Sequence, residues 1–245
     1  MDKDIIARNF SRCARLYDRY ADIQMTAAAE LVRLLPNKGV ENILEIGCGT
    51  GNYTAVLRER FGSAGIKALD ISKAMIEAAK GKPRQSDIEF IVADAESFCP
   101  DEKFDLITSN AAVQWFEDLD RAVSRYSDAL TERGRMIFST FGPETFRELR
   151  KVLGGDLRTA SGDFLDKGAL EAILKKHLSR IRIRKLMVKE VYRSLAELLR
   201  KIKYTGVRGN ESRAFPLKKT EKLYKKMFGR VEATYEIYLC SGDRH

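Results

Sequence analysis

The chain has 245 residues, of which 44% are hydrophobic and 32% are charged, and its formal net charge is +9. This composition is ordinary for a soluble globular protein, and no apolar run approaches the roughly 20 residues of a membrane span. The N-terminus contains acidic residues and lacks the apolar stretch of a signal peptide, and the four cysteines are scattered along the chain. We therefore expect a cytoplasmic protein with reduced thiols and no metal site.

Seven short apolar runs predict β-strands, and they cover residues 42–47, 66–72, 88–94, 104–110, 134–141, 180–190 and 232–240. Amphipathic segments between them predict helices near residues 26–35, 51–60, 73–80, 118–131, 142–153, 164–176, 194–204 and 218–228. Strands that alternate with helices imply an α/β fold with a mainly parallel sheet and right-handed crossovers.

No repeat or low-complexity linker divides the chain, so we expect a single domain. Its expected parts are an N-terminal helical lid (1–35), a Rossmann-like core (40–190), a basic helical insertion (191–230) and a last strand with its tail (231–245). The positive charge is concentrated near the third part, because residues 175–230 hold 19 of the 44 basic but only 4 of the 35 acidic side chains. Such a region attracts an acidic partner, which could be a nucleic acid, an anionic membrane or an acidic protein.

The segment "NFSRCARLYDRYADIQ" (9–24) precedes the first predicted strand. Helical spacing places Phe10, Ala14, Tyr17, Ala21 and Gln24 on one stripe. Aromatic rings and an amide on such a stripe either pack against the core or cover a ligand site, and periodicity does not separate the two interpretations.

The segment "LEIGCGTG" (44–51) joins a predicted strand to a helix. Gly47, Gly49 and Gly51 lack side chains, so a ligand can lie against the backbone there; the alternative is that they form only a tight turn. Asp70 ends the next strand, 19 residues after Gly51, where a carboxylate can accept both hydroxyls of a ribose. Asp94 ends the third strand, where it could meet an adenine amino group.

Two cofactors, a dinucleotide and S-adenosylmethionine, bind to sites built from a strand, a glycine loop and an acidic residue on the next strand. The dinucleotide motif is G-x-G-x-x-G, whereas this chain has G-x-G-x-G preceded by Glu45. That pattern resembles the E/D-x-G-x-G-x-G motif of class I S-adenosylmethionine-dependent methyltransferases, and it implies a seven-stranded Rossmann-like sheet with helices on both faces. The expected cofactor is S-adenosylmethionine, with Glu45 favouring its cationic ammonium group. The residues expected to bind it are Phe10, Tyr17, Gln24, Glu45, Gly47, Gly49, Gly51, Asp70, Ile71, Met75, Asp94, Ala95 and Asn110.

The segment "SNAAVQWF" (109–116), directly after the fourth strand, constrains the identity of the methyl acceptor. Methylases of base or amide nitrogens commonly have an Asn/Asp-Pro-Pro-aromatic tetrad here, and this chain has none. Trp115 could form a wall of the acceptor pocket or belong to the core, and Gln114 is expected to contact the acceptor. Neither histidine of the chain, His177 or His245, is placed as a general base. A carboxylate acceptor with a pKa of about 4 needs no base at neutral pH, so its methylation depends mainly on positioning and desolvation.

Four segments carry a more specific resemblance. The segment 9–24, called the leader below, resembles the F-S-x-x-A-x-x-Y-D-x-x-A-x-x-Q motif of the malonyl-acyl-carrier-protein O-methyltransferases of biotin synthesis. "SNAAVQW", "STFGPETFRELR" and "LLRKIKYTGV" resemble segments of that family in the same order. The resemblance covers most of the chain. It implies methylation of the free carboxylate of a malonyl thioester on acyl carrier protein, which hides a charge and starts the synthesis of pimeloyl precursors.

In that interpretation the leader is a lid, and Tyr17 and Asp18 touch the methionine end of the donor or the acceptor. Arg147 is the first candidate to hold the malonyl carboxylate with its planar fork, and Lys203 is the second. The residues expected to dock the acidic carrier protein are Lys201, Lys203, Arg208 and Arg213.

Three alternatives remain open on the sequence. A carboxyl methyltransferase acting on a free small acid such as aconitate would share the donor site without needing the basic region. A nucleic-acid methyltransferase would use that region for phosphates, although no RNA-binding module is present. A non-catalytic binding module would keep only a vestigial donor site. We expect a monomer that binds neither nucleic acid nor membrane.

Overall fold

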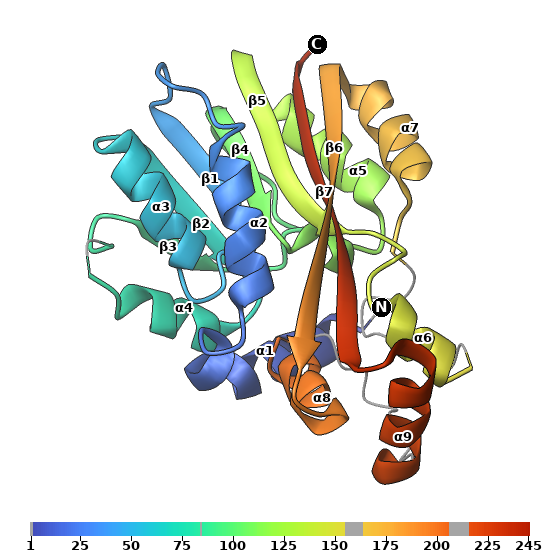
Figure 1. Ribbon diagram of the computed structural model, residues 1–245. Coiled ribbons are helices and arrows are strands. Elements are labelled where there is room, and N and C mark those ends of the chain that lie inside the picture. The colour runs from blue at the N-terminus through green and yellow to red at the C-terminus, as the bar shows by residue number, and fades with distance from the viewer. Residues whose placement is uncertain (1, 84, 155–163, 206–215) are drawn as a thin grey trace.

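The computed structural model describes residues 2–83, 85–154, 164–205 and 216–245. One sheet of seven strands runs through the molecule in the order β3-β2-β1-β4-β5-β7-β6 (Figure 1). The strands are β1 Asn42–Ile46, β2 Gly65–Asp70, β3 Glu89–Val92, β4 Phe104–Asn110, β5 Leu130–Phe141, β6 Leu178–Tyr192 and β7 Val231–Arg244. The first five are parallel, and β7 is antiparallel to both of its neighbours, β5 and β6. The predicted α/β fold with a seven-stranded sheet is confirmed.

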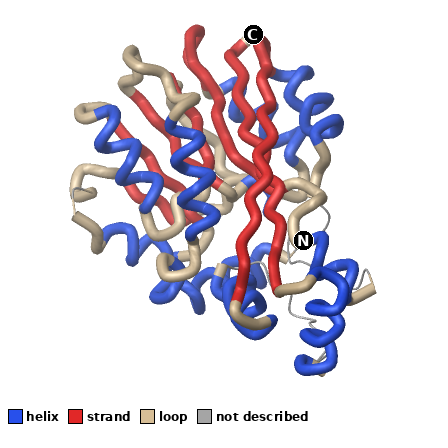
Figure 2. Tube along the Cα trace, viewed as in Figure 1, coloured by secondary structure: helices blue, strands red, loops and turns tan. Residues whose placement is uncertain are grey.

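Helices cover both faces of this sheet. The helices of the described residues are α1 Lys3–Tyr17, α2 Asp22–Val32, α3 Asn52–Phe61, α4 Lys73–Lys80, α5 Leu119–Asp128, α6 Arg147–Val152, α7 Lys167–His177, α8 Leu195–Tyr204 and α9 Leu217–Phe228, with a 3₁₀ turn at Val113–Trp115. Helices α2 and α3 lie in front of the sheet and α5 and α7 behind it (Figure 2). Successive residues of β1 therefore enter different cores, Ile43 on the α2 side and Leu44 on the α5 side.

Of the remaining helices, α4 connects β2 to β3, and α1, α6, α8 and α9 gather at the end of the sheet where the parallel strands finish (Figure 1). Helices α8 and α9 connect β6 to β7, which pair along almost their whole length. No helix in the described part of the chain has the length and apolar character needed to cross a bilayer.

The leader is not the single helix that its periodicity predicts. Helix α1 ends at Tyr17, and α2 begins at Asp22. Between them the Asp18 carboxylate reaches the glycine loop, where it accepts hydrogen bonds from Thr50 Oγ1 at 2.5 Å and Asn52 Nδ2 at 2.9 Å. These contacts hold the chain in a turn, so the residues after position 18 leave the stripe of α1.

Helix α6 is also shorter than predicted, because it begins at Arg147 and not near residue 142. The preceding residues bond instead to β7, with Gly142 N donating to Glu236 O and Phe146 N to Thr234 O. Phe146 has a φ of 59°, a left-handed conformation that turns the chain into the helix. The segment after β5 is therefore fixed across the neighbouring strand before α6 starts.

Candidate functional site

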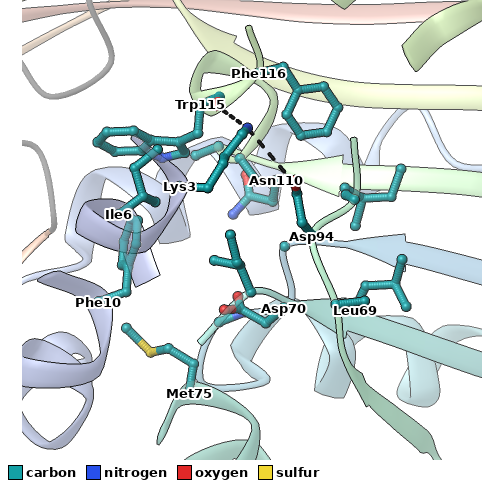
Figure 3. Close-up of a pocket in the computed structure, with 18 of the residues that line it drawn as sticks. Lys3, Ile6, Phe10, Leu69, Asp70, Met75, Asp94, Asn110, Trp115 and Phe116 are labelled. Atoms are coloured by element: carbon teal, nitrogen blue, oxygen red, sulfur yellow. Dashed lines mark hydrogen bonds and ion pairs between the residues drawn. The ribbon is translucent and has the colours of Figure 1, made fainter. Parts of the chain in front are cut away.

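A cavity of about 650 Å³, counted with its open mouth, lies where β1, β2 and β4 end, beneath α1 (Figure 3). Ligands of open α/β sheets bind at this edge, outside the carboxyl ends of the strands. Ten of the predicted cofactor contacts line it: Phe10, Tyr17, Gly47, Gly49, Asp70, Ile71, Met75, Asp94, Ala95 and Asn110. Sequence reasoning therefore located the cavity, although it assigned three further residues to it, Gln24, Glu45 and Gly51, that do not line it.

The three glycines of the loop serve different purposes. All have a positive φ: 69° at Gly47, 55° at Gly49 and 80° at Gly51. A Cβ on Gly47 would lie 2.2 Å from Ala112 Cβ, and one on Gly51 would lie 2.6 Å from Gln85 Oε1. A Cβ on Gly49 would meet no atom within 4 Å. Gly47 and Gly51 are thus required by packing, whereas Gly49 leaves open space beside the cavity that a ligand can fill.

Asp70 lies on the cavity wall with its carboxylate fixed by the backbone. Its Oδ2 accepts from Gly49 N at 2.9 Å, and its Oδ1 accepts from Ser72 N at 2.8 Å. Burial raises the pKa of Asp70 to about 6, although both backbone N–H groups favour the ionised form. The group is therefore charged at neutral pH, and each oxygen keeps a lone pair for a ligand hydroxyl.

Helix α1 roofs the cavity with aromatic rings. Phe10 meets Trp115 edge to face at 5.4 Å between ring centroids, and it lies 6.3 Å from Tyr17. Trp115 is 7% exposed and lines the cavity, so it is both a packed residue and a wall. Burial raises the pKa of Tyr17 above its ordinary value, and the neighbouring carboxylates of Asp70 and Asp18 raise it further. Tyr17 therefore offers a hydroxyl to the cavity and not a phenolate.

Lys3 and Ile6 also line the cavity, and the sequence analysis missed both. Lys3 Nζ pairs with Glu96, donates to Trp115 O at 2.8 Å and lies 3.9 Å from Asp94 Oδ1 (Figure 3). Lys3 therefore covers the end of the cavity at which Asp94 lies. A signal was available, because extending the Phe10 stripe backwards by one and two helical turns reaches Ile6 and Lys3.

Glu45 is not the ammonium partner that its position before the loop suggested. Its side chain is 1% exposed and does not line the cavity, because alternation along β1 turns it to the face opposite Leu44 and Ile46. Its Oε2 is buried without a hydrogen-bond partner among the described residues. Burial raises the pKa of Glu45 to about 8, so the group is mostly uncharged at neutral pH.

Three other predicted residues are placed elsewhere. Asp18 binds Thr50, Asn52 and Lys82, and so holds α1 to the glycine loop without lining the cavity. Gln114 donates to Ala111 O at 2.6 Å and also lies outside the cavity. Gln24 lines a second and much smaller cavity.

The cations proposed to hold the acceptor lie outside both cavities. Arg147 pairs with Glu144 at 3.2 Å and Glu148 at 3.1 Å, and 42% of its side chain is exposed. Arg147, the first candidate for the malonyl carboxylate, therefore lies away from the cavity, because the segment before α6 is bonded to β7. Lys203 is exposed, with its Nζ 5.5 Å from the centre of the Tyr204 ring.

The buried cation of this region is Lys201, which is 7% exposed and therefore unavailable for docking a partner. It lines the second cavity and bonds to Asp22 and Glu190. Arg208 and Arg213, which were also expected to dock the partner, lie outside the described residues.

A family model described as a methyltransferase domain matches residues 44–138. The malonyl-[acyl-carrier protein] O-methyltransferase 2 of Ilyobacter polytropus is 35% identical over 248 residues, which cover 99% of this chain and 93% of that protein. The malonyl-[acyl-carrier protein] O-methyltransferase of a Paenibacillus species is 34% identical over 96% of this chain and 93% of its own length. An S-adenosylmethionine-dependent methyltransferase from Mesorhizobium loti has a similar fold, with a TM-score of 0.56, 20% identity, and coverage of 90% of this chain and 100% of that one. The chain belongs to the malonyl-[acyl-carrier protein] O-methyltransferase family.

Proposed function

We propose that this protein transfers a methyl group from S-adenosylmethionine to the free carboxylate of malonyl-acyl carrier protein, which begins pimeloyl synthesis for biotin. One observation supports the proposal above all. The cavity with Gly49 and Asp70 in its wall is roofed by α1, which carries much of the leader motif shared with this family. The four free cysteines agree with a reducing cytoplasm, and we propose that the protein acts there as a monomer.

The residues of the larger cavity fit S-adenosylmethionine. The open space at Gly49 admits a ligand against the backbone, and the Asp70 carboxylate is placed to accept ribose hydroxyls. Asp94 at the far end would face the adenine amino group, beside Lys3. When bound, S-adenosylmethionine supplies an electrophilic methyl group on a sulfonium centre. Phe10 and Trp115 would exclude water from it, which strengthens the electrostatic interactions inside the cavity.

The groups around this cavity favour an acceptor that is already ionised. Tyr17 is held protonated, and Asp70 is bonded to two backbone N–H groups. His177, the last residue of α7, pairs with Asp120 of α5 at 2.6 Å and does not line the cavity, so it does not serve as a base here. A malonyl carboxylate needs no base, and the protein would contribute by holding it in line with the methyl group and by keeping water out. The Tyr17 hydroxyl is our candidate for orienting it.

For the carrier protein we propose a docking surface on α9. This helix exposes five lysines, Lys218, Lys219, Lys222, Lys225 and Lys226. Leu217, Leu223 and Met227 are exposed on the same helix. Among these lysines Lys225 pairs with Glu221. A basic surface with exposed apolar side chains suits an acidic helical partner, whose association it would accelerate at low salt.

The proposal is tested by offering the protein S-adenosylmethionine with malonyl-acyl carrier protein, malonyl-coenzyme A, aconitate and transfer RNA in separate reactions. Mass spectrometry should detect methylation of malonyl-acyl carrier protein at a kcat/KM well above that for the other three. Preferred methylation of aconitate or RNA would replace the proposal with one of its alternatives. Binding of the donor without transfer to any of the four would point to a non-catalytic module.

A further inference from the structure

Among the described residues that line the larger cavity, Lys3 alone carries a positive charge. It is the first residue of α1, and Asp94 follows the end of β3. The ammonium group of Lys3 and the carboxylate of Asp94 point toward each other at one end of the cavity (Figure 3). That end therefore presents a hydrogen-bond donor and a hydrogen-bond acceptor side by side.

The ammonium group of Lys3 is held in place by two loops. Its Nζ pairs with Glu96, from the loop after β3, and donates to Trp115 O, after β4, at 2.8 Å. Glu96 Oε1 in turn accepts from the backbone N–H groups of Glu117 and Asp118, each at 2.8 Å. Although burial favours the neutral form, the Asp118 N–H, Lys3 and the Glu117 N–H hold the pKa of Glu96 below its ordinary value. Glu96 is therefore charged at neutral pH and keeps Lys3 at this end of the cavity.

One hydrogen of this ammonium group remains for a ligand. A lysine has three, and those bonded to Glu96 and Trp115 account for two. Asp94 Oδ1, at 3.9 Å, is beyond hydrogen-bond distance, so the third hydrogen has no acceptor within the described part of the chain. Asp94 Oδ1 accepts from Glu96 N at 3.0 Å, which leaves Oδ2 for a ligand. Both groups can therefore bind a ligand without giving up a bond that they already make.

Adenine carries the complementary pair of groups. Its 6-amino group donates hydrogen bonds, and the ring nitrogens N1 and N7, one on each side of it, accept them. A base whose amino group faces Asp94 brings one of these nitrogens toward the groups next to Asp94, and Lys3 is the side chain there with a hydrogen to donate. A hydrogen bond from an ammonium group is stronger than one between neutral groups.

Resting on the proposed function, we infer that Lys3 is a specificity-determining residue for S-adenosylmethionine, donating a hydrogen bond to N1 or N7 of adenine while Asp94 accepts from the amino group. The roof helix α1 is then part of the adenine site and not only its cover. A site built to hydrogen-bond a ligand atom rejects analogues that lack the atom, because its own polar group is left unpaired.

The test measures the affinity of three ligands by calorimetry, without methyl transfer. They are S-adenosylhomocysteine and its 1-deaza and 7-deaza analogues, in which a C–H group replaces one ring nitrogen. Wild-type protein should bind one of the two analogues about tenfold more weakly than the parent ligand, the effect of losing one charge-assisted hydrogen bond. Lys3→Met keeps the length of the side chain and removes its charge and its hydrogens. In this variant the ratio of the two affinities should fall from about ten to about one.

Lys82→Met is the matched control. Lys82 and Lys3 each expose 24% of their side chains, and Lys82 pairs with Asp18 at the other end of α1 without lining the cavity. This variant also removes an ion pair of the roof, but it should leave the ratio at about ten.

Two results would overturn the role of Lys3. One is equal binding of all three ligands by wild-type protein, which needs no variant. The other is the same ratio in wild type and Lys3→Met, which would show that another group binds the ring nitrogen and that Lys3 only fastens α1. Wild-type protein that binds none of the three ligands would instead refute the proposed S-adenosylmethionine site, and the role of Lys3 with it.

Discussion

Replacing Gly49 with alanine would place a methyl group in the open space that the glycine loop leaves beside the larger cavity, which we propose binds the methyl donor. The Cβ would meet no protein atom within 4 Å, so it would not disturb the packing of the protein itself. The backbone there has a φ of 55°, and the left-handed conformation costs an L-residue roughly 1–2 kcal/mol. A ligand pressed against that backbone would also meet the methyl group. Overpacking of that kind costs about 1–3 kcal/mol, or about 5- to 150-fold in Kd.

Gly39 provides a matched control for the backbone strain. Its φ is 76°, a Cβ on it would also meet no atom within 4 Å, and it is exposed away from the cavity. Gly39→Ala and Gly49→Ala should lower Tm by similar amounts, about 2–8 °C. Only Gly49→Ala should weaken the binding of S-adenosylhomocysteine measured by calorimetry. Equal ligand affinity in the two folded variants would refute the assignment of this cavity to the methyl donor.

Three further predictions concern charge. Asp70→Ala should weaken S-adenosylhomocysteine binding by on the order of 1.5–3 kcal/mol. Because the pKa of Asp70 is about 6, wild-type affinity should fall as the pH drops below that value, up to about the same 10- to 150-fold, and calorimetry should show no such fall in the variant. Burial raises the pKa of Glu45 to about 8, so its contribution to stability is present at low pH and is lost as the pH rises to that value. Glu45→Gln should therefore gain roughly 4 kcal/mol relative to wild type between about pH 5 and about pH 8 in urea unfolding; a constant difference would contradict the buried placement. Reversing Lys218 and Lys222 to glutamate should raise KM for malonyl-acyl carrier protein at low salt and leave KM for a small malonyl thioester unchanged; equal effects on both substrates would exclude docking on α9.

The order of strands and helices could be predicted from the sequence because apolar runs and amphipathic segments alternate clearly up to β5. The glycine spacing and Asp70 then pointed to the larger cavity, which Gly47, Gly49 and Asp70 line, since these residues lie close to strand ends. The break between α1 and α2 could not be predicted, because no proline or glycine marks it. It depends on the bonds from Asp18 to Thr50 and Asn52, which are more than 30 residues away in the sequence.

The acceptor side was less predictable for similar reasons. Arg147 comes after a strand tip in sequence, but backbone bonds to β7 carry the chain away from the ligand edge before α6 begins. Glu45 lies on a strand buried on both faces, so its proximity to the loop does not say which face it occupies. Lys201 looked like one of many surface cations, and only the contacts with Asp22 and Glu190, from two different elements, show that it is buried.

The central claim is that the malonyl carboxylate itself receives the methyl group. The most direct measurement supplies S-adenosylmethionine labelled in its methyl group, with malonyl-acyl carrier protein and acetyl-acyl carrier protein in parallel reactions. Label should enter only the malonyl form, and mild alkali should release it as methanol, because a methyl ester hydrolyses under those conditions. Label in the acetyl form, or label that resists alkali, would contradict the account.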